Sequence, residues 1–392
     1  MRLLFVHEVD YALKPVFEMH EFPEYLHMNG HDVTFLDYQE SRRGSVVPRR
    51  CYLAGRSRST STVSLISTCA PIVGIIGRIV VALKSWWDVG RILRARAFDA
   101  VVLYGVPTNG PAVCWWGRRL GVPVMYRAID VSHQLRATVF RPLVRCAERF
   151  VARWSSHVSV HNSSLGQYLL QLADRPIPIS VDVPAVDLGT EPTDAEVVGL
   201  RRRLGVEPSA RVILYRGTIY RFSGLVELVE LVAPFLRMRS DVVFLIVGDG
   251  EHRTRVEDAV VDLDLGDVVR MAGFVDRSDL YALFRLASVS VNPFRSSLVT
   301  NAALPTRVLQ SLRAGIPCVS TPLEGLRSLL PESQCLRYRS LDNSFVDAIR
   351  DLLDRDTSTT CSESRGSCAL PAMFDSTLAW KSLEARVGAL VT

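Results

Sequence analysis

The run Val242-Val243-Phe244-Leu245-Ile246-Val247 is apolar throughout and ends abruptly at Gly248-Asp249-Gly250. A short all-apolar run closed by a turn is typical of a parallel strand that is buried on both faces. A helical pattern over 251–265 follows it, and the same order of strand and helix repeats through 268–321. Three such units in succession predict an α/β domain with a doubly wound, Rossmann-like parallel sheet.

The predicted sheet also indicates where a ligand would bind. Ligands of open parallel sheets lie beyond the carboxyl ends of the strands, where the free N–H groups of helix N-termini attract anions. The loop 294–304 follows a strand expected at 289–291 and carries three hydroxyls, one amide and one arginine, but no acid. We therefore expect this loop to tolerate an anionic ligand.

The chain is long enough for two domains. It has 392 residues, of which 48% are hydrophobic and 22% charged, as in globular proteins. Strand and helix patterns predict a first Rossmann-like domain over 1–183, with a basic insertion at 41–98, and a second over 197–372. The Pro, Gly and acidic residues of 181–196 predict a linker between them.

The N-terminus and the cysteines indicate the compartment. The apolar stretch after Arg2 is too short for a signal peptide, and the eight cysteines contain no Cys-x-x-Cys pair. We therefore expect a cytoplasmic protein with reduced thiols, with neither a zinc site nor a disulfide framework.

The insertion 41–98 carries the basic character of the chain, with eleven bases and one acid. We predict a flexible basic loop over 41–61, and a surface helix or helix pair over 63–83 in place of a membrane span. Bases beside apolar residues such as Trp86 and Trp87 favour docking on an anionic membrane surface. A soluble basic loop is the alternative, and nucleic acid is not expected because no recognition motif accompanies the charge.

Several segments of the second half match one family in order and spacing. They are 215–218 with 224–225, 246–250, 269–275, 289–293 and 314–321. In these segments the chain resembles the GT-B nucleotide-sugar glycosyltransferases, in particular the large retaining family called group 1 or family four. The first half is similar more weakly, through 30–33 and 121–124.

The resemblance implies two Rossmann-like domains facing across a cleft, with a last helix, 373–392, that crosses back to the first domain. A nucleotide diphosphate sugar would be the donor, held by the second domain without a metal or other cofactor. A glycan or lipid-linked acceptor of cell-envelope polysaccharide synthesis would be held by the first domain, and transfer would retain the anomeric configuration. The lipid-linked acceptor, and a protein that acts in the cytoplasm or peripherally on the inner face of the membrane, are expected from the basic apolar segment 41–98 and not from the resemblance.

The resemblance also implies donor-site residues. The family's Glu-x7-Glu pair falls on Ala302 and Gln310, and its usual Arg and Lys fall on Thr218 and Ser223. The candidate diphosphate-binding residues are Arg216, Gly217, Thr218, Arg221, Thr306 and Arg307. The candidate nucleoside-binding residues are Gly248, Gly250, Gly273, Phe274, Val275 and Gln310. The four glycines close strands, where a turn requires them with or without a ligand.

The first domain holds the other candidates. Asp130 and His133 follow a strand end and are the candidate catalytic residues, because histidine can bond to or carry a proton at neutral pH. A histidine satisfied by local structure is the alternative. His7, Glu8 and Lys14 in the loop after the first strand are candidates for the acceptor side.

Two further functions remain open at this point. The neutral Ala302 and Gln310 are compatible with a non-catalytic GT-B scaffold that binds a nucleotide or a partner protein. A nucleotide-sugar epimerase on the same fold is the third hypothesis.

Overall fold

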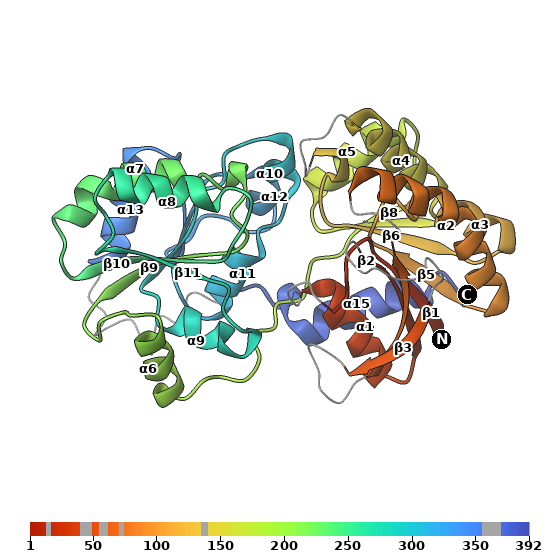
Figure 1. The fold of residues 1–392 in the computed structure, drawn as a ribbon, viewed down its shortest axis with the longest axis horizontal. Helices are drawn as coiled ribbons and strands as arrows, with labels where there is room; N and C mark the ends of the chain where they lie inside the picture. Colours follow the sequence, from red (N-terminus) through yellow and green to blue (C-terminus); the bar gives the residue numbers. More distant parts are fainter. Residues whose placement is uncertain are drawn as a thin grey trace. The chain divides into compact units, whose positions relative to one another are not determined.

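The computed structural model describes residues 1–12, 17–39, 49–54, 62–69, 74–134, 140–354 and 370–391. The chain forms two compact units. Unit 1 consists of Met1–Ala185 together with Ser376–Thr392, and unit 2 is Val186–Asp375. Each unit is built on one largely parallel sheet covered by helices on both faces (Figure 1).

The sheet of unit 1 has the order β3-β4-β2-β1-β5-β6-β7-β8, and all neighbours are parallel except β3 and β4. Its strands are β1 (Arg2–Val6), β2 (Asp32–Gln39), β3 (Arg49–Ala54), β4 (Thr62–Cys69), β5 (Ala100–Leu103), β6 (Val124–Ala128), β7 (His157–Val160) and β8 (Ile179–Val181). Its helices are α1 (Glu18–Met28), α2 (Ile75–Ala95), α3 (Gly110–Leu120), the 3-10 turn η1 (Ser132–Gln134), α4 (Arg141–Trp154), α5 (Ser163–Ala173) and α15 (Ser376–Gly388).

The helices of unit 1 form two layers. Helices α2 to α5 cover one face of the sheet, and α1 and α15 cover the other (Figure 1). Trp380 of α15 is fully buried and stacks on Phe22 of α1, with ring centroids 5.4 Å apart. Burial of large aromatic rings is a strong stabilising contribution, so α15 belongs to the core of unit 1.

The predictions for 41–98 were wrong in part. Residues 49–54 are strand β3 and residues 62–69 are strand β4, where a loop and the start of a helix were expected. The sequence Thr62-Val63-Ser64-Leu65-Ile66-Ser67-Thr68 is rich in β-branched residues, and it pairs with β2 in the register Thr34↔Ser64. Gly74, with φ of 97°, separates this strand from α2. Residues 41–48 and 55–61 lie outside the described residues.

The sheet of unit 2 has the order β11-β10-β9-β12-β13-β14 and is parallel throughout. Its strands are β9 (Arg211–Arg216), β10 (Val242–Val247), β11 (Val269–Gly273), β12 (Val289–Asn292), β13 (Cys318–Ser320) and β14 (Leu336–Tyr338). Its helices are α6 (Asp194–Arg203), α7 (Leu225–Arg237), α8 (Arg253–Asp262), α9 (Leu280–Arg285), α10 (Leu298–Ala302), α11 (Thr306–Arg313), α12 (Glu324–Arg327) and α13 (Asn343–Leu353). The turns η2 (Arg221–Ser223), η3 (Arg277–Asp279) and η4 (Ala372–Phe374) complete it.

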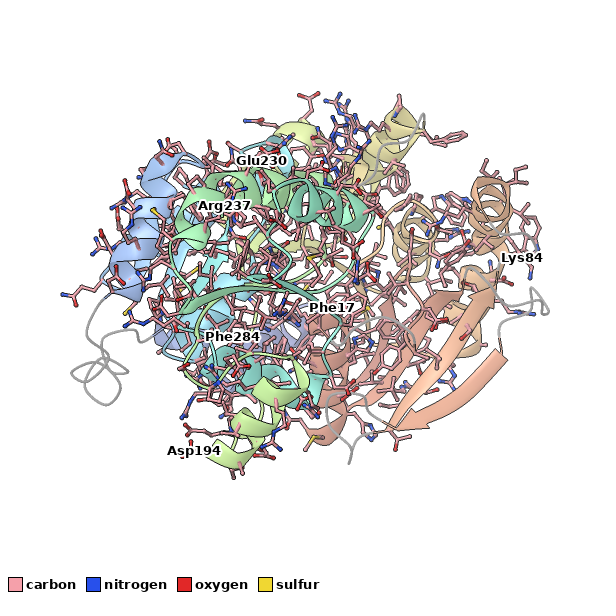
Figure 2. All side chains as sticks on the ribbon, turned by 60° about the vertical axis from the view of Figure 1, so that its left-hand side comes forward. Phe17, Lys84, Asp194, Glu230, Arg237 and Phe284 are labelled. Atoms are coloured by element: carbon pink, nitrogen blue, oxygen red, sulfur yellow. The ribbon has the colours of Figure 1, made fainter. Side chains whose placement is uncertain are left out.

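The apolar run 242–247 lies at the buried centre of unit 2. Strand β10 lies between β9 and β11, and Phe244 and Ile246 are fully buried against helices α7 and α8. Helix α7 turns its apolar side to this core, while Glu230 and Arg237 lie on its exposed side (Figure 2). The predicted parallel sheet is thus confirmed.

Two other expectations need correction. The predicted linker 181–196 runs into α6, which begins at Asp194 because Thr193 and Glu196 form a capping box. Cys335 is disulfide-bonded, so the expectation of only reduced thiols was wrong, whereas Cys114, Cys146 and Cys318 are free. Spacing could not show this, because disulfide formation depends on the geometry of the fold. Within the described part of the chain, no helix has the length and apolar character needed to cross a bilayer.

Candidate functional site

The carboxyl ends of β9 and β10 meet at one edge of the unit 2 sheet. Gly217 follows β9 with φ of 140°, and Gly248 follows β10 with φ of 137°. A Cβ at Gly248 would overlap the carbonyl oxygen of Gly217, and one at Gly250 would overlap that of Ile219. Gly248 and Gly250 are therefore required by the packing of two loops against each other, whether or not a ligand is bound.

Arg307 of α11 lies against this glycine turn. Its Nη2 atom is 2.5 Å from the position that a Cβ of Gly217 would take, so glycine makes room for the guanidinium. The guanidinium carbon lies 4.4 Å from the ring centroid of Tyr215 and 4.5 Å from that of Phe294. These two rings fix the position of the cation by cation–π contacts.

The guanidinium of Arg307 has no acid partner in the part of the chain that the structure describes. The residue is only 8% exposed, and its Nη1 atom is buried with no hydrogen-bond partner. No carboxylate of the described residues lies within ion-pair distance of it. Because a buried cation without a partner is unfavourable, this position is suited to an anionic ligand that supplies the missing hydrogen bonds.

Two more predicted donor-site residues contact each other. Arg216 Nη1 donates to Gln310 Oε1 over 2.9 Å, so a predicted diphosphate-binding residue and a predicted nucleoside-binding residue share one hydrogen bond. The carbonyl of Thr218 accepts a hydrogen bond of 3.0 Å from the Tyr215 hydroxyl. Thr306 is exposed as the first residue of α11.

The remaining donor-site candidates are more open. Arg221 is exposed in η2, Phe274 is exposed after β11, and Val275 packs against the core that contains α6 and α9. Gly273 has φ of 67°. The loop 294–304 is not free of acids in three dimensions, because Arg295 forms an ion pair with Glu227 of α7.

Sequence reasoning missed two buried polar atoms near α11. Ser311 Oγ and Asn292 Oδ1 are buried without hydrogen-bond partners in the described structure. Ser311 follows Arg307 by one helical turn, so both lie on the same side of α11. The spacing of four residues between Arg307 and Ser311 was visible in the sequence and could have pointed to this hydroxyl.

In unit 1, His133 is held by three neighbours, one of which is the side-chain nitrogen of Gln134, 3.2 Å from Nε2. Its Nδ1 atom lies 2.9 Å from Glu148 Oε2 and 3.0 Å from the Tyr168 hydroxyl, which also donates to Glu148 over 2.8 Å. Burial, with Glu148 nearby, raises the pKa of Asp130 to about 7. The structure therefore brings Asp130 and His133 together around Glu148, a residue of α4 that the sequence did not single out.

Glu8 binds the backbone at the start of helix α3. Its carboxylate accepts hydrogen bonds from the backbone N–H groups of Thr108 and Asn109 and a 2.8 Å bond from the Thr108 hydroxyl. These groups stand at the start of α3, where an acid is favourable. Burial raises the pKa of Glu8 in spite of these bonds. His7 stacks on Tyr104 with centroids 5.6 Å apart, and Lys14 lies outside the described residues.

A buried ion network crosses the carboxyl edge of the unit 1 sheet and was missed. Arg127 of β6 binds Glu18 through Nε (2.7 Å) and Nη2 (2.9 Å), and its Nη1 donates to Ser159 (2.9 Å) and to the carbonyl of Asp182 (2.6 Å). His161 lies 3.0 Å from Glu18. Burial alone would raise the pKa of Glu18, but Arg127 and His161 hold this pKa below its usual range.

Both halves of the chain match known protein families. Residues 210–355, which contain the Arg307 site, match the model of "Glycosyl transferases group 1", and residues 19–181 match the "Glycosyl transferase 4-like domain". The chain belongs to the group 1 glycosyltransferases. The two matches cover most of both units of this glycosyltransferase.

Named relatives of this glycosyltransferase are similar over part of their length. The 2-deoxystreptamine glucosyltransferase of Streptomyces kanamyceticus is 28% identical over 58% of the chain and 56% of the relative. The D-inositol 3-phosphate glycosyltransferase of Kineococcus radiotolerans is 33% identical over 39% of the chain and 36% of the relative. The chain thus spans about half or less of the length of these relatives.

Solved structures share the whole fold. Sucrose-phosphate synthase from Thermosynechococcus elongatus has a TM-score of 0.76 at 15% identity and covers 99% of this chain and 98% of its own. Anabaena HepE, solved in complex with UDP and glucose, has a TM-score of 0.75 at 14% identity and covers 99% of this chain and 100% of its own. The glycosyltransferase therefore has the GT-B fold of two Rossmann-like domains.

Within this glycosyltransferase, no group of three His, Cys, Asp or Glu side chains in the described ranges is arranged to hold a metal ion. Ala302, the first position of the expected acid pair, is buried in α10. Gln310, the second position, is held by Arg216. The charged group that the structure places most firmly at the predicted donor site is therefore a cation, Arg307.

Proposed function

We propose that this protein transfers a sugar from a nucleotide diphosphate sugar to a hydroxyl of a glycan or lipid-linked acceptor. The observation that carries this proposal is the buried guanidinium of Arg307, which is fixed between two aromatic rings and has an unpartnered Nη1 atom. A pyrophosphate oxygen is an acceptor of the right charge for this donor. The names of the relatives, a glucosyltransferase and an inositol phosphate glycosyltransferase, support the reaction class.

In the proposed reaction, the bond between the acceptor oxygen and the anomeric carbon forms while the bond from that carbon to the diphosphate breaks. Negative charge grows on the leaving diphosphate, and an oxygen of this diphosphate takes up the proton that the acceptor hydroxyl loses. A cation fixed beforehand stabilises this charge without reorganising, so Arg307 takes the part that a metal ion plays elsewhere. We propose retention of the anomeric configuration, in keeping with the family resemblance.

His133 is proposed to contact a sugar hydroxyl. Glu148 accepts the Nδ1–H of the ring, so Nε2 is the hydrogen-bond acceptor of the neutral imidazole. The side-chain nitrogen of Gln134 lies 3.2 Å from this Nε2 atom, and the sugar hydroxyl would take its place. The contact between Glu148 and Tyr168 holds both partners in place. Glu148 is thus a positioning residue for His133.

The proposal is tested with a panel of UDP-, GDP-, ADP- and dTDP-sugars, by thermal shift and by release of free sugar. One nucleotide should stabilise the protein, and Arg307→Met should lose that stabilisation because the anion loses its buried donor. Arg295→Met is the matched control, since Arg295 already has an acid partner in Glu227. Equal binding by wild type and Arg307→Met would contradict the proposed site.

A non-catalytic scaffold is the second candidate. The apolar Ala302 and the neutral Gln310 favour it, because neither supplies a carboxylate to a donor sugar or ribose. Under this alternative a nucleotide binds but no sugar is released or transferred, even with a broad set of acceptors. Sugar transfer that disappears in Arg307→Met would exclude the scaffold.

A further inference from the structure

Helix α2 of unit 1 exposes a continuous apolar stripe. Its members are spaced at helical intervals along one face of the helix, so they form a single surface. The exposed fractions are 62% for Ile76, 42% for Ile79, 38% for Val80, 68% for Leu83 and 81% for Trp87. Trp86, 36% exposed, borders the stripe. Contiguous exposed apolar surface of this kind marks an interaction site.

The opposite face of α2 fastens the helix to unit 1. Val81 is buried against Tyr38, and the Ser85 hydroxyl donates to the carbonyl of Thr108 over 3.2 Å. Gly90 lies directly under the ring of Trp116, whose indole N–H donates to the carbonyl of Trp86 over 2.6 Å. The stripe is therefore presented by a helix that is already packed, and its exposure does not depend on local unfolding.

The surroundings of the stripe are cationic. Residues 75–120, which contain α2 and its neighbour α3, hold seven bases and two acids. Lys84 of α2 (Figure 2) and Arg91 both lie beside Asp88, at 3.4 and 3.6 Å. Arg118 and Arg119 are exposed at the end of α3, and Arg94 stacks on Trp116 at 4.1 Å from the ring centroid. Apolar side chains flanked by tryptophans and bases complement the boundary between lipid tails and anionic headgroups.

We infer that the stripe of α2 docks unit 1 on a leaflet that contains anionic phospholipid. Leu83 and Trp87 enter the apolar layer, and Lys84, Arg91 and the α3 arginines face the headgroups. The helix lies in the plane of the leaflet, since no helix of the described residues can span a bilayer. Docking itself does not depend on the proposed sugar transfer, whereas the route that it offers to a lipid-linked acceptor rests on the proposed function.

Vesicle sedimentation of the full chain tests the inference. Vesicles of phosphatidylcholine with added phosphatidylglycerol should bind the protein, and binding should weaken at high salt. Leu83→Gln/Trp87→Gln should lower the partition coefficient by about tenfold or more, because two apolar side chains are lost from the lipid. Lys84→Gln/Arg91→Gln should weaken binding to the vesicles that contain phosphatidylglycerol, and should leave binding to pure phosphatidylcholine vesicles unchanged.

A matched control uses equally exposed apolar residues of unit 2. Met238 and Val261 are 74% and 76% exposed, so Met238→Gln/Val261→Gln removes similar surface and should leave vesicle binding unchanged. Absence of wild-type binding to anionic vesicles, or unchanged binding by Leu83→Gln/Trp87→Gln, would overturn the inference. So would a wild-type dimer that this double variant converts to a monomer, because a second copy would then cover the stripe.

Loss of vesicle binding can be told apart from failure of the proposed function. Release of sugar from a soluble donor, measured without vesicles, should be equal in wild type and Leu83→Gln/Trp87→Gln. Equal melting temperatures should show that both proteins are folded.

Discussion

Each unit contains a buried arginine, and the two arginines differ in their hydrogen-bond partners. In unit 1, Arg127 is fully buried, and its guanidinium is satisfied by a bidentate carboxylate, a hydroxyl and a carbonyl. In unit 2, Arg307 is almost as buried, but it has aromatic rings on its faces and an unpartnered Nη1 atom. The first is a closed structural network, and the second is open to a ligand. Burial alone therefore does not identify a functional cation. The distinguishing property is whether the protein satisfies the hydrogen bonds of the buried guanidinium.

The largest expected effect on stability comes from removing the acid partner of Arg127. Glu18→Ala leaves Arg127 buried without its anion, which should lower the free energy of unfolding by about 3–5 kcal/mol. Urea unfolding measures this. The matched control is Glu227→Ala, because its partner Arg295 is half exposed, and it should cost less than about 1 kcal/mol. Similar losses in the two variants would remove the distinction between a buried network and a surface pair.

Removing the open cation should affect binding more than stability. Arg307→Met breaks no ion pair of the described residues and ends the burial of a cation, so the free energy of unfolding should change by less than about 1 kcal/mol. Nucleotide affinity should fall at least about tenfold, as expected for a lost charge-assisted hydrogen bond. Calorimetric titration and urea unfolding of the same variant separate the two effects. A large loss of stability would show that Arg307 is as structural as Arg127.

A pH titration extends the comparison from the buried arginines to a buried acid, Asp130. Its pKa is raised to about 7, so the folded state holds a proton there more tightly than the unfolded state. The resulting stability is fully present below the unfolded pKa of about 4 and is lost as the pH rises through about 7, by about 1–3 kcal/mol. Asp130→Asn should flatten this decline between about pH 4 and 7. An unchanged slope would assign the titration to another group.

The smallest effect is expected at the partly exposed rim of unit 1. Glu384 of α15 accepts hydrogen bonds from Tyr25 (3.2 Å) and Asn29 (3.3 Å) and lies 2.7 Å from His31. Glu384→Gln should lower the free energy of unfolding by only about 0.5–1 kcal/mol, because water competes for these groups. A loss as large as that of Glu18→Ala would mean that exposure does not set the strength of these networks.

The sequence predicted the sheet of unit 2 well and the polar network of unit 1 poorly. Apolar runs such as 242–247 have a local pattern, and the glycine turns and Arg307 could be located from motif resemblance. Glu18 and Arg127 are 109 residues apart in the sequence, and Glu18 and His161 are 143 apart, so no local period connects them. A charged residue inside the otherwise apolar strand β6 was the one available signal, because it requires a buried partner.

The insertion shows a different limit. Thr62–Cys69 is apolar enough for a helix and short enough for a strand, and apolar runs of this length are ambiguous without their neighbours. Pairing with β2 decides in favour of the strand. Lys14 and residues 41–48 and 55–61 were also part of the predictions and lie outside the described residues.

The position of Trp380 has a consequence for biosynthesis. The core of unit 1 is built from the start of the chain and from α15, while the whole of unit 2 lies between them in sequence. On the ribosome, Phe22 and its neighbours must wait for Trp380 until unit 2 has been translated. Unit 2, whose residues are contiguous, can fold as soon as it emerges, so the order of completion reverses the usual order of synthesis, N-terminal domain first. A nascent unit 1 therefore exposes an incomplete apolar face for most of translation, which makes it the part of the protein that most needs a chaperone.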